Sequence, residues 1–224
     1  MRVSWYALAG AVCLTAICQA GRADTLKFNN STGSTVDAGS KTESAQNVYV
    51  YPYNFSVNGS STNTQLMCIS FDNHIVNGES WDVNVESIGE AAANTTQLQQ
   101  YEEDAWLFSQ ITPGSTQQQI ANIQVAAWAV GDPTVASSKY DPYYAANSTA
   151  INNLLSEALI NSTPADLSNY NNYVLYVPTS WDASDGEPQT FIGPAPTPEP
   201  GSLALLGTGL LGMGGVLRRR MRKA

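Results

Sequence analysis

The chain of 224 residues has no arginine between Arg22 and Arg218. Over residues 24–199 its nineteen carboxylates are balanced by only three lysines, which leaves sixteen net negative charges. Nucleic acids and anionic lipid surfaces repel such a protein, because both bind basic patches on their partners. The composition therefore excludes nucleic-acid binding as a function of this central segment.

Metal-ligating side chains are scarce as well. His74 is the single histidine, and Cys68 is the only cysteine after the N-terminal Cys13 and Cys18. One histidine and one cysteine do not make a zinc site, and no Asp-x-Asp-x-Asp-Gly loop indicates calcium. We therefore predict no metal and no cofactor. A lone cysteine in an exported protein cannot form an internal disulfide, so Cys68 calls for another explanation.

The N-terminal segment has the layout of a secretory signal peptide. A short basic start precedes an almost entirely apolar stretch over residues 6–18. Small residues then occupy the −3 and −1 positions of a cut between Ala23 and Asp24. The pattern predicts a signal peptide over residues 1–23 that signal peptidase removes, with a cut after Ala20 as the alternative.

The C-terminal segment combines a Pro-rich spacer with a Pro-Glu-Pro motif, an apolar run and a basic cluster. The spacer covers residues 194–201 and contains the motif Pro198, Glu199 and Pro200. The apolar run covers residues 202–217, and the basic cluster, residues 218–224, contains Arg218, Arg219 and Arg220. As a helix, Leu203–Leu217 would be about 22 Å long, shorter than the ~30 Å hydrocarbon core of a bilayer. Its five glycines weaken the helix further. So marginal a transmembrane helix suits a temporary anchor; a permanent single-pass anchor is the alternative.

This C-terminal arrangement resembles the PEP-CTERM sorting signal of bacterial envelope proteins. The resemblance implies that exosortase, a membrane protease-transpeptidase, recognises the segment 198–200 and removes the tail. Because the basic residues 218–224 stay in the cytoplasm, the body lies on the other side of the inner membrane. We expect an anchored precursor first, and then an envelope or extracellular protein.

The pattern of residues 24–193 predicts a single β-rich α+β domain with about three helices. Alternating aromatic and β-branched residues predict strands, while capping residues before apolar stripes predict helices. Strands are expected at residues 26–28, 47–57 (interrupted by Pro52), 65–71, 81–85, 173–177 and 191–192, and helices at 94–110, 116–130 and 148–160. A run of helices between two groups of strands is typical of the α+β class.

Gln124 places an amide in the middle of an apolar helix stripe, one turn before Trp128. A buried amide must find hydrogen-bond partners. The segment 123–128, Ile-Gln-Val-Ala-Ala-Trp, resembles the Thr-Gln-x-Ala-Ile-Trp motif of bacterial surface thioester domains, with isoleucine and alanine replacing two motif residues. The resemblance implies a covalent bond between Gln124 and a strand cysteine, here Cys68, although the separation is short for the family.

In such a bond the thiolate of Cys68 attacks the Gln124 carboxamide and ammonia leaves. The strained acyl-sulfur bond is then open to an amine or hydroxyl on a host, matrix or sibling molecule. Because this transfer happens once, we predict a non-enzymatic interaction protein of the surface or biofilm matrix, with a role in adhesion.

Other interpretations of these residues stay open. Cys68 can be a small buried hydrophobe and Gln124 a satisfied core amide. His74 could form a hydrolytic dyad with Cys68, and the carboxylates at residues 102–104 indicate a solvated helix face. Trp181 and the tyrosines within residues 140–144 would suit sugar stacking. The alternative function is therefore a secreted protein that binds or hydrolyses polysaccharide.

Overall fold

The computed structural model describes residues 24–162, 170–181 and 187–196. Along this part of the chain, six strands precede four helices and two strands follow them, so the predicted order of strands, helices and strands is confirmed. The contacts within the chain divide it into two units, with the boundary after Pro194.

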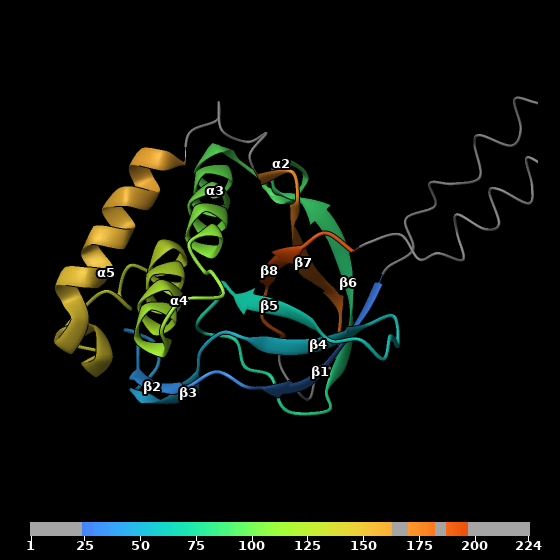
Figure 1. Cartoon of the computed structure of the whole chain (residues 1–224), viewed down its shortest axis with the longest axis horizontal. Helices are drawn as coiled ribbons and strands as arrows, with labels where there is room; N and C mark the ends of the chain where they lie inside the picture. The colour runs from blue at the N-terminus through green and yellow to red at the C-terminus, as the bar shows by residue number, and fades with distance from the viewer. Residues whose placement is uncertain (1–23, 163–169, 182–186, 197–224) are drawn as a thin grey trace, which may run out of the picture. The chain divides into compact units, whose positions relative to one another are not determined.

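Six antiparallel strands form a closed barrel in the order β1-β4-β5-β8-β7-β6 (Figure 1). Their bounds are β1 Asp24–Ser31, β4 Tyr53–Val57, β5 Thr64–Cys68, β6 Ser80–Ser87, β7 Tyr173–Ser180 and β8 Phe191–Pro194. β7 and β8 follow all the helices in the chain, and they fill the gap between β6 and β5. Closure satisfies the backbone groups that an open sheet would leave unpaired at its edges.

Aromatic rings from four strands meet in the core of the barrel. The Phe55 ring centroid lies 4.7 Å from that of Phe191, 5.3 Å from Phe28 and 5.9 Å from Trp81. A small barrel has an interior just wide enough to be filled by its own side chains. The interior of the barrel is therefore a core of packed aromatic side chains.

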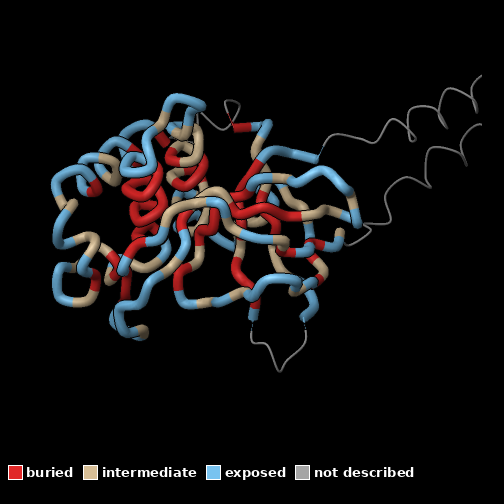
Figure 2. The backbone as a smooth tube through the Cα atoms, turned by 60° about the horizontal axis from the view of Figure 1, so that its bottom comes forward, coloured by how far each residue is buried: buried red, intermediate tan, exposed pale blue. Residues whose placement is uncertain are grey.

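The helices form a second layer beside the barrel (Figure 1). They are α2 Ile88–Ala91, α3 Thr95–Ser109, α4 Gln117–Gly131 and α5 Pro142–Asn161. α3, α4 and α5 contact one another, and the layer meets the barrel where α4 packs on β5 and α3 on β8. α4 is buried over every residue from Ile120 to Val130, so it is the central helix, as its red segment in Figure 2 shows.

Capping residues decide where the helices begin. Asn94, Thr116 and Asp141 each accept a hydrogen bond from the backbone N–H three residues later. The first two confirm the predicted starts of α3 and α4. The prediction for α5 was six residues late, because the helix starts at the Asp-Pro pair before its apolar stripe begins.

The predicted strand over residues 47–57 divides into two. β3 (Gln46–Tyr49) pairs with β2 (Thr35–Ala38) as a separate hairpin, whereas β4 joins the barrel. Pro52 lies between β3 and β4 and has no N–H with which to continue a ladder. The predicted interruption is therefore confirmed, although β4 is an internal strand of a closed barrel.

None of the helices within residues 24–162, 170–181 and 187–196 is long and apolar enough to cross a membrane. The predicted signal peptide (residues 1–23) and the predicted transmembrane sorting helix (residues 202–217) lie outside these described ranges.

The connection from β1 to β2 depends on a glycine. A Cβ atom at Gly33 would lie 1.9 Å from the carbonyl oxygen of Val50 and 2.5 Å from that of Tyr51. Because both are backbone atoms, we expect Gly33→Ala to lower the free energy of unfolding by about 2–4 kcal/mol in urea titrations. Gly114→Ala is the matched control, since a Cβ there meets nothing within 4 Å; its change should stay within about 1 kcal/mol. Equal stabilities of the two variants would contradict this packing.

Candidate functional site

Cys68 ends strand β5 at the junction of the barrel and the helical layer. Its backbone is in register with Phe191 of β8, and α4 packs on β5 from the other layer. Because β5 belongs to a closed barrel, one face of the strand end points to the barrel interior, and α4 covers the other. This double cover explains why Leu66, Met67 and Cys68 are all fully buried, where a strand with one solvated face would alternate.

Gln124 of α4 bridges two segments of the strand layer. Its Nε2 donates a hydrogen bond of 2.6 Å to the carbonyl oxygen of Cys68, and its Oε1 accepts one of 3.2 Å from the backbone N–H of Tyr51. The side chain has no exposed surface. The structure thus brings the Gln124 amide to the backbone carbonyl of Cys68, the residue with which the sequence motif pairs it.

The thiol of Cys68 is free and protonated. Sγ donates to the carbonyl oxygen of Ser70 at 3.0 Å. Burial raises the pKa of the thiol to about 12, and the smaller effects of the Trp128 side chain and of Ser70 lower it only in part. The thiolate is the form of cysteine that binds metals and reacts with alkylating agents. Because Cys68 is a thiol at neutral pH, it reacts with neither in the folded protein.

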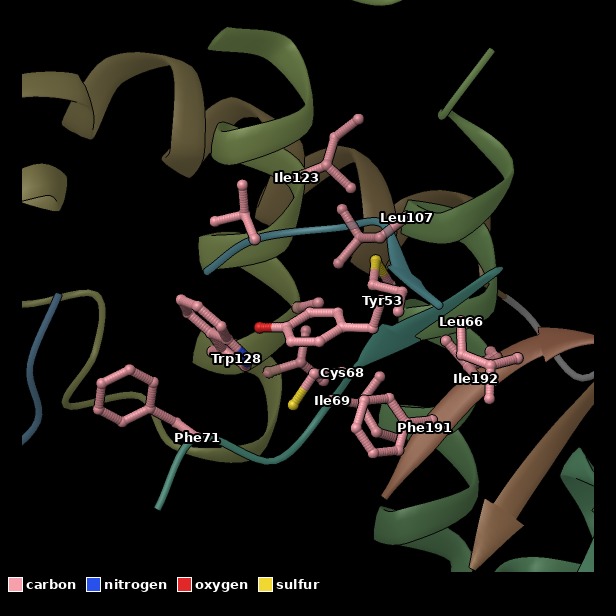
Figure 3. Close-up of a cluster of buried hydrophobic side chains, with 14 of the residues drawn as sticks. Tyr53, Leu66, Cys68, Ile69, Phe71, Leu107, Ile123, Trp128, Phe191 and Ile192 are labelled. Carbon is pink, nitrogen blue, oxygen red and sulfur yellow. The ribbon is translucent and has the colours of Figure 1, made fainter. Parts of the chain in front are cut away.

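Aromatic side chains enclose the thiol. Figure 3 shows Tyr53, Phe71 and Trp128 around Cys68, and the rings of Phe71 and Trp128 meet edge to face at 5.1 Å. Burial raises the pKa of the Tyr53 phenol, and the nearby Cys68 raises it further. Such a wall keeps water away from the pair, which is what a hydrolysable acyl bond requires.

Two carboxyl groups are buried on α3, so the prediction of a solvated face at residues 102–104 was wrong. Glu102 is 1% and Asp104 2% exposed. Burial, and then the charge of Glu103, raises the pKa of Asp104 well above its ordinary value. The charge of Asp104 in turn raises the pKa of Cys68, so Asp104 belongs to the surroundings of the thiol. Its spacing of three residues from Leu107, which is also buried, was the signal in the sequence.

A pocket of about 190 Å³ shares part of this wall. Its aromatic lining consists of Phe28, Tyr49, Tyr53, Phe71 and Trp128, the last three of which also surround Cys68. The pocket has polar lining residues too, among them three side-chain amides and His74. Sequence patterns did not indicate the pocket, because its lining comes from segments far apart in the chain.

The other predicted site residues have different places. His74 lines the pocket. Its Nε2 forms a hydrogen bond of 2.9 Å with a carboxylate oxygen of Glu43, so its partner is Glu43 and not Cys68. Trp181 follows β7, whereas the tyrosines of residues 140–144 precede or begin α5, on the far side of α3 and α4 (Figure 1). They do not form one sugar-stacking patch.

The predicted processing sites lie at or beyond the limits of the described residues. Asp24 is the first residue of β1, while Ala23 is outside the described ranges. The same holds for the sorting motif and the membrane stop. These are Pro198, Glu199, Pro200, Arg218, Arg219 and Arg220.

Residues 196–220 match the family model of the PEP-CTERM protein-sorting motif. The predicted sorting signal is therefore confirmed, and the chain is an exported protein that exosortase sorts and processes at the membrane. No curated protein and no solved structure matches the chain. The function of the body has to be argued from its own geometry.

Asp104→Asn tests the buried, protonated carboxyl beside the thiol. A carboxyl whose pKa is raised in the folded state stabilises the fold most below its ordinary value of 3.8, and this stability is lost as the pH rises through the raised value. We expect the variant to be more stable than the wild type at about pH 8, with the difference shrinking toward about pH 4.

Urea unfolding at several pH values measures this difference. Glu157→Gln, which removes an exposed carboxylate of α5, is the control for the loss of one negative charge. If Asp104→Asn were less stable than the wild type at every pH by the same amount, the carboxyl would be making a required hydrogen bond, and our description of it would be wrong.

Proposed function

We propose that this exported protein attaches covalently to a surface or matrix partner through a thioester between Cys68 and Gln124. The observation that supports the proposal most is the 2.6 Å hydrogen bond from the Gln124 amide to the carbonyl oxygen of Cys68. This bond holds a carboxamide against the one residue of the described body that carries a thiol, and both side chains are fully buried.

The thioester forms from the two side chains alone. Sγ of Cys68 adds to the carboxamide carbon of Gln124, the thiol proton passes to the amide nitrogen, the C–N bond breaks and ammonia leaves. Negative charge develops on Oε1 during the addition, and the backbone N–H of Tyr51 already donates to that oxygen. No oxidant or metal takes part, since the reaction is an acyl transfer.

The protonated thiol makes this a slow, single event. Burial holds the pKa of Cys68 near 12, so the thiol gives up its proton only as the new bond forms. The aromatic wall of Tyr53, Phe71 and Trp128 then shields the acyl-sulfur bond from hydrolysis. Once exported, the protein carries a stored acyl group that is used only once.

The partner is captured in the second step. A nucleophilic group of the partner attacks the acyl carbon, the C–S bond breaks, Cys68 regains its proton, and an amide or ester joins the two molecules. The Gln124 acyl group is consumed by one transfer. The protein therefore acts as a covalent clamp and has no turnover.

A purely structural role of Gln124 is the competing explanation, because the same two hydrogen bonds satisfy the buried amide. The intact mass of the full-length protein, purified without reducing agents or amines, separates the two. We expect the wild type to lack the mass of one ammonia molecule, and to gain one molecule of methylamine when it is treated with that amine.

Cys68→Ala and Gln124→Glu are the matched variants for this measurement. The first removes the nucleophile, and the second keeps the shape of the side chain but has no ammonia to lose. Both should show the mass of their sequence and no reaction with methylamine. A wild type with unmodified mass, whose Cys68 is alkylated after unfolding, would leave Gln124 as a structural amide only.

A further inference from the structure

The pocket beside Cys68 has the size and lining for one small ring. At about 190 Å³ it is smaller than the roughly 300–1,000 Å³ of sites that take drug-sized ligands. Among its aromatic residues Tyr49 offers a flat apolar face, whereas Tyr53 and Trp128 are 5% and 2% exposed and form the buried wall of the pocket. The Tyr49 side chain is 53% exposed, so a ligand can reach it from solvent.

Polar groups in the same lining offer both donors and acceptors. Gln46, Asn47 and Gln189 each contribute a side-chain amide. Gln189 is 7% exposed, and its Oε1 has no hydrogen-bond partner among the described residues, whereas the side chain of Trp128 lies within hydrogen-bonding reach of Cys68.

The lining contains no lysine or arginine, so an anionic ligand finds no counter-charge there. The carboxylate of Glu43 already shares a hydrogen bond with the lining residue His74. Aromatic faces together with uncharged amides suit the C–H faces and hydroxyl groups of a neutral sugar.

We propose that this pocket binds one neutral sugar residue of a polysaccharide, and that one of its hydroxyl groups reacts with the Cys68–Gln124 pair on the other side of the aromatic wall. The binding stands on the pocket, whereas the transfer rests on the proposed thioester. In the transfer the hydroxyl oxygen attacks the Gln124 acyl carbon, the C–S bond breaks and the hydroxyl proton passes to the sulfur of Cys68. An ester then links the protein to the sugar, and Tyr53 and Trp128 form the wall that the hydroxyl has to pass.

Sugar binding is measured on the full-length Cys68→Ala protein, in which no thioester forms. Glucose, galactose and mannose are titrated separately, with tryptophan fluorescence and saturation-transfer NMR as readouts, and glucuronate is the anionic comparison. We expect saturable binding of at least one neutral sugar and none of glucuronate. Adding Tyr49→Ala should weaken binding about tenfold, because a stacking face is lost. Trp181→Ala, which removes an exposed ring outside the pocket, should leave it unchanged.

Failure to bind any of the three sugars, or equal effects of Tyr49→Ala and Trp181→Ala, would overturn the inference whether or not the thioester exists.

For the transfer, the wild type is incubated with an oligosaccharide of the sugar that binds. We expect an adduct that hydroxylamine releases, as it does esters. A wild type that has lost ammonia and reacts with methylamine, yet never with the oligosaccharide, would overturn the sugar as acceptor while the thioester stands. Sugar binding by Cys68→Ala, together with an unmodified wild-type mass, would support the pocket and refute the thioester.

Discussion

The side-chain amide of Gln124 ties the helical layer to the barrel from inside a dry core. α4 is buried along eleven consecutive residues, and the hydrogen bond from Gln124 to the Cys68 carbonyl is buried, whereas the one from the Tyr51 N–H is partly buried. Without the amide, the N–H of Tyr51 and the carbonyl of Cys68 would lose their partner, and each unpaired group costs about 1–3 kcal/mol. The two bonds also fix the rotation of α4. This rotation places Trp128, one turn after Gln124, in the wall shared by the thiol and the pocket.

The shortage of cations explains the character of this core. With three lysines and no arginine over residues 24–199, a buried carboxylate has few counter-ions to pair with, so it keeps its proton. The pKa of Asp104 is raised well above its ordinary value, and that of Asp141 rises to about 6, both mainly by burial. A protonated thiol, a carboxyl with a raised pKa and an uncharged amide therefore lie in this core. Such surroundings suit the exchange of one acyl group between neutral partners better than chemistry that needs a standing charge.

Local elements of this fold were predictable because their signals are short. The caps Asn94 and Thr116 directly precede the helices α3 and α4 that they begin. Pro52 likewise lies directly between the strands β3 and β4 that it separates. The pairing of Cys68 with Gln124 came from a six-residue motif and an amide in an apolar stripe. Barrel closure was not predictable. β8 is only four residues long, and all the helices lie between it and its partner β5 in the sequence. The burial of Asp104 was missed because the run of three acidic residues outweighed its spacing from Leu107.

The order of the elements along the chain bears on when the site is complete. Cys68 comes first, Gln124 follows with the helices, and the cover over Cys68 is finished only when Phe191 of β8 pairs with it. Pairings between distant segments form late, because the loop between them must be closed before the contact stabilises it. The sorting motif begins at residue 196, directly after β8 ends at Pro194. The cover over the thiol therefore needs the chain as far as Pro194, directly before the sorting motif, and an acyl bond that water would hydrolyse has no fully protected place without that last strand.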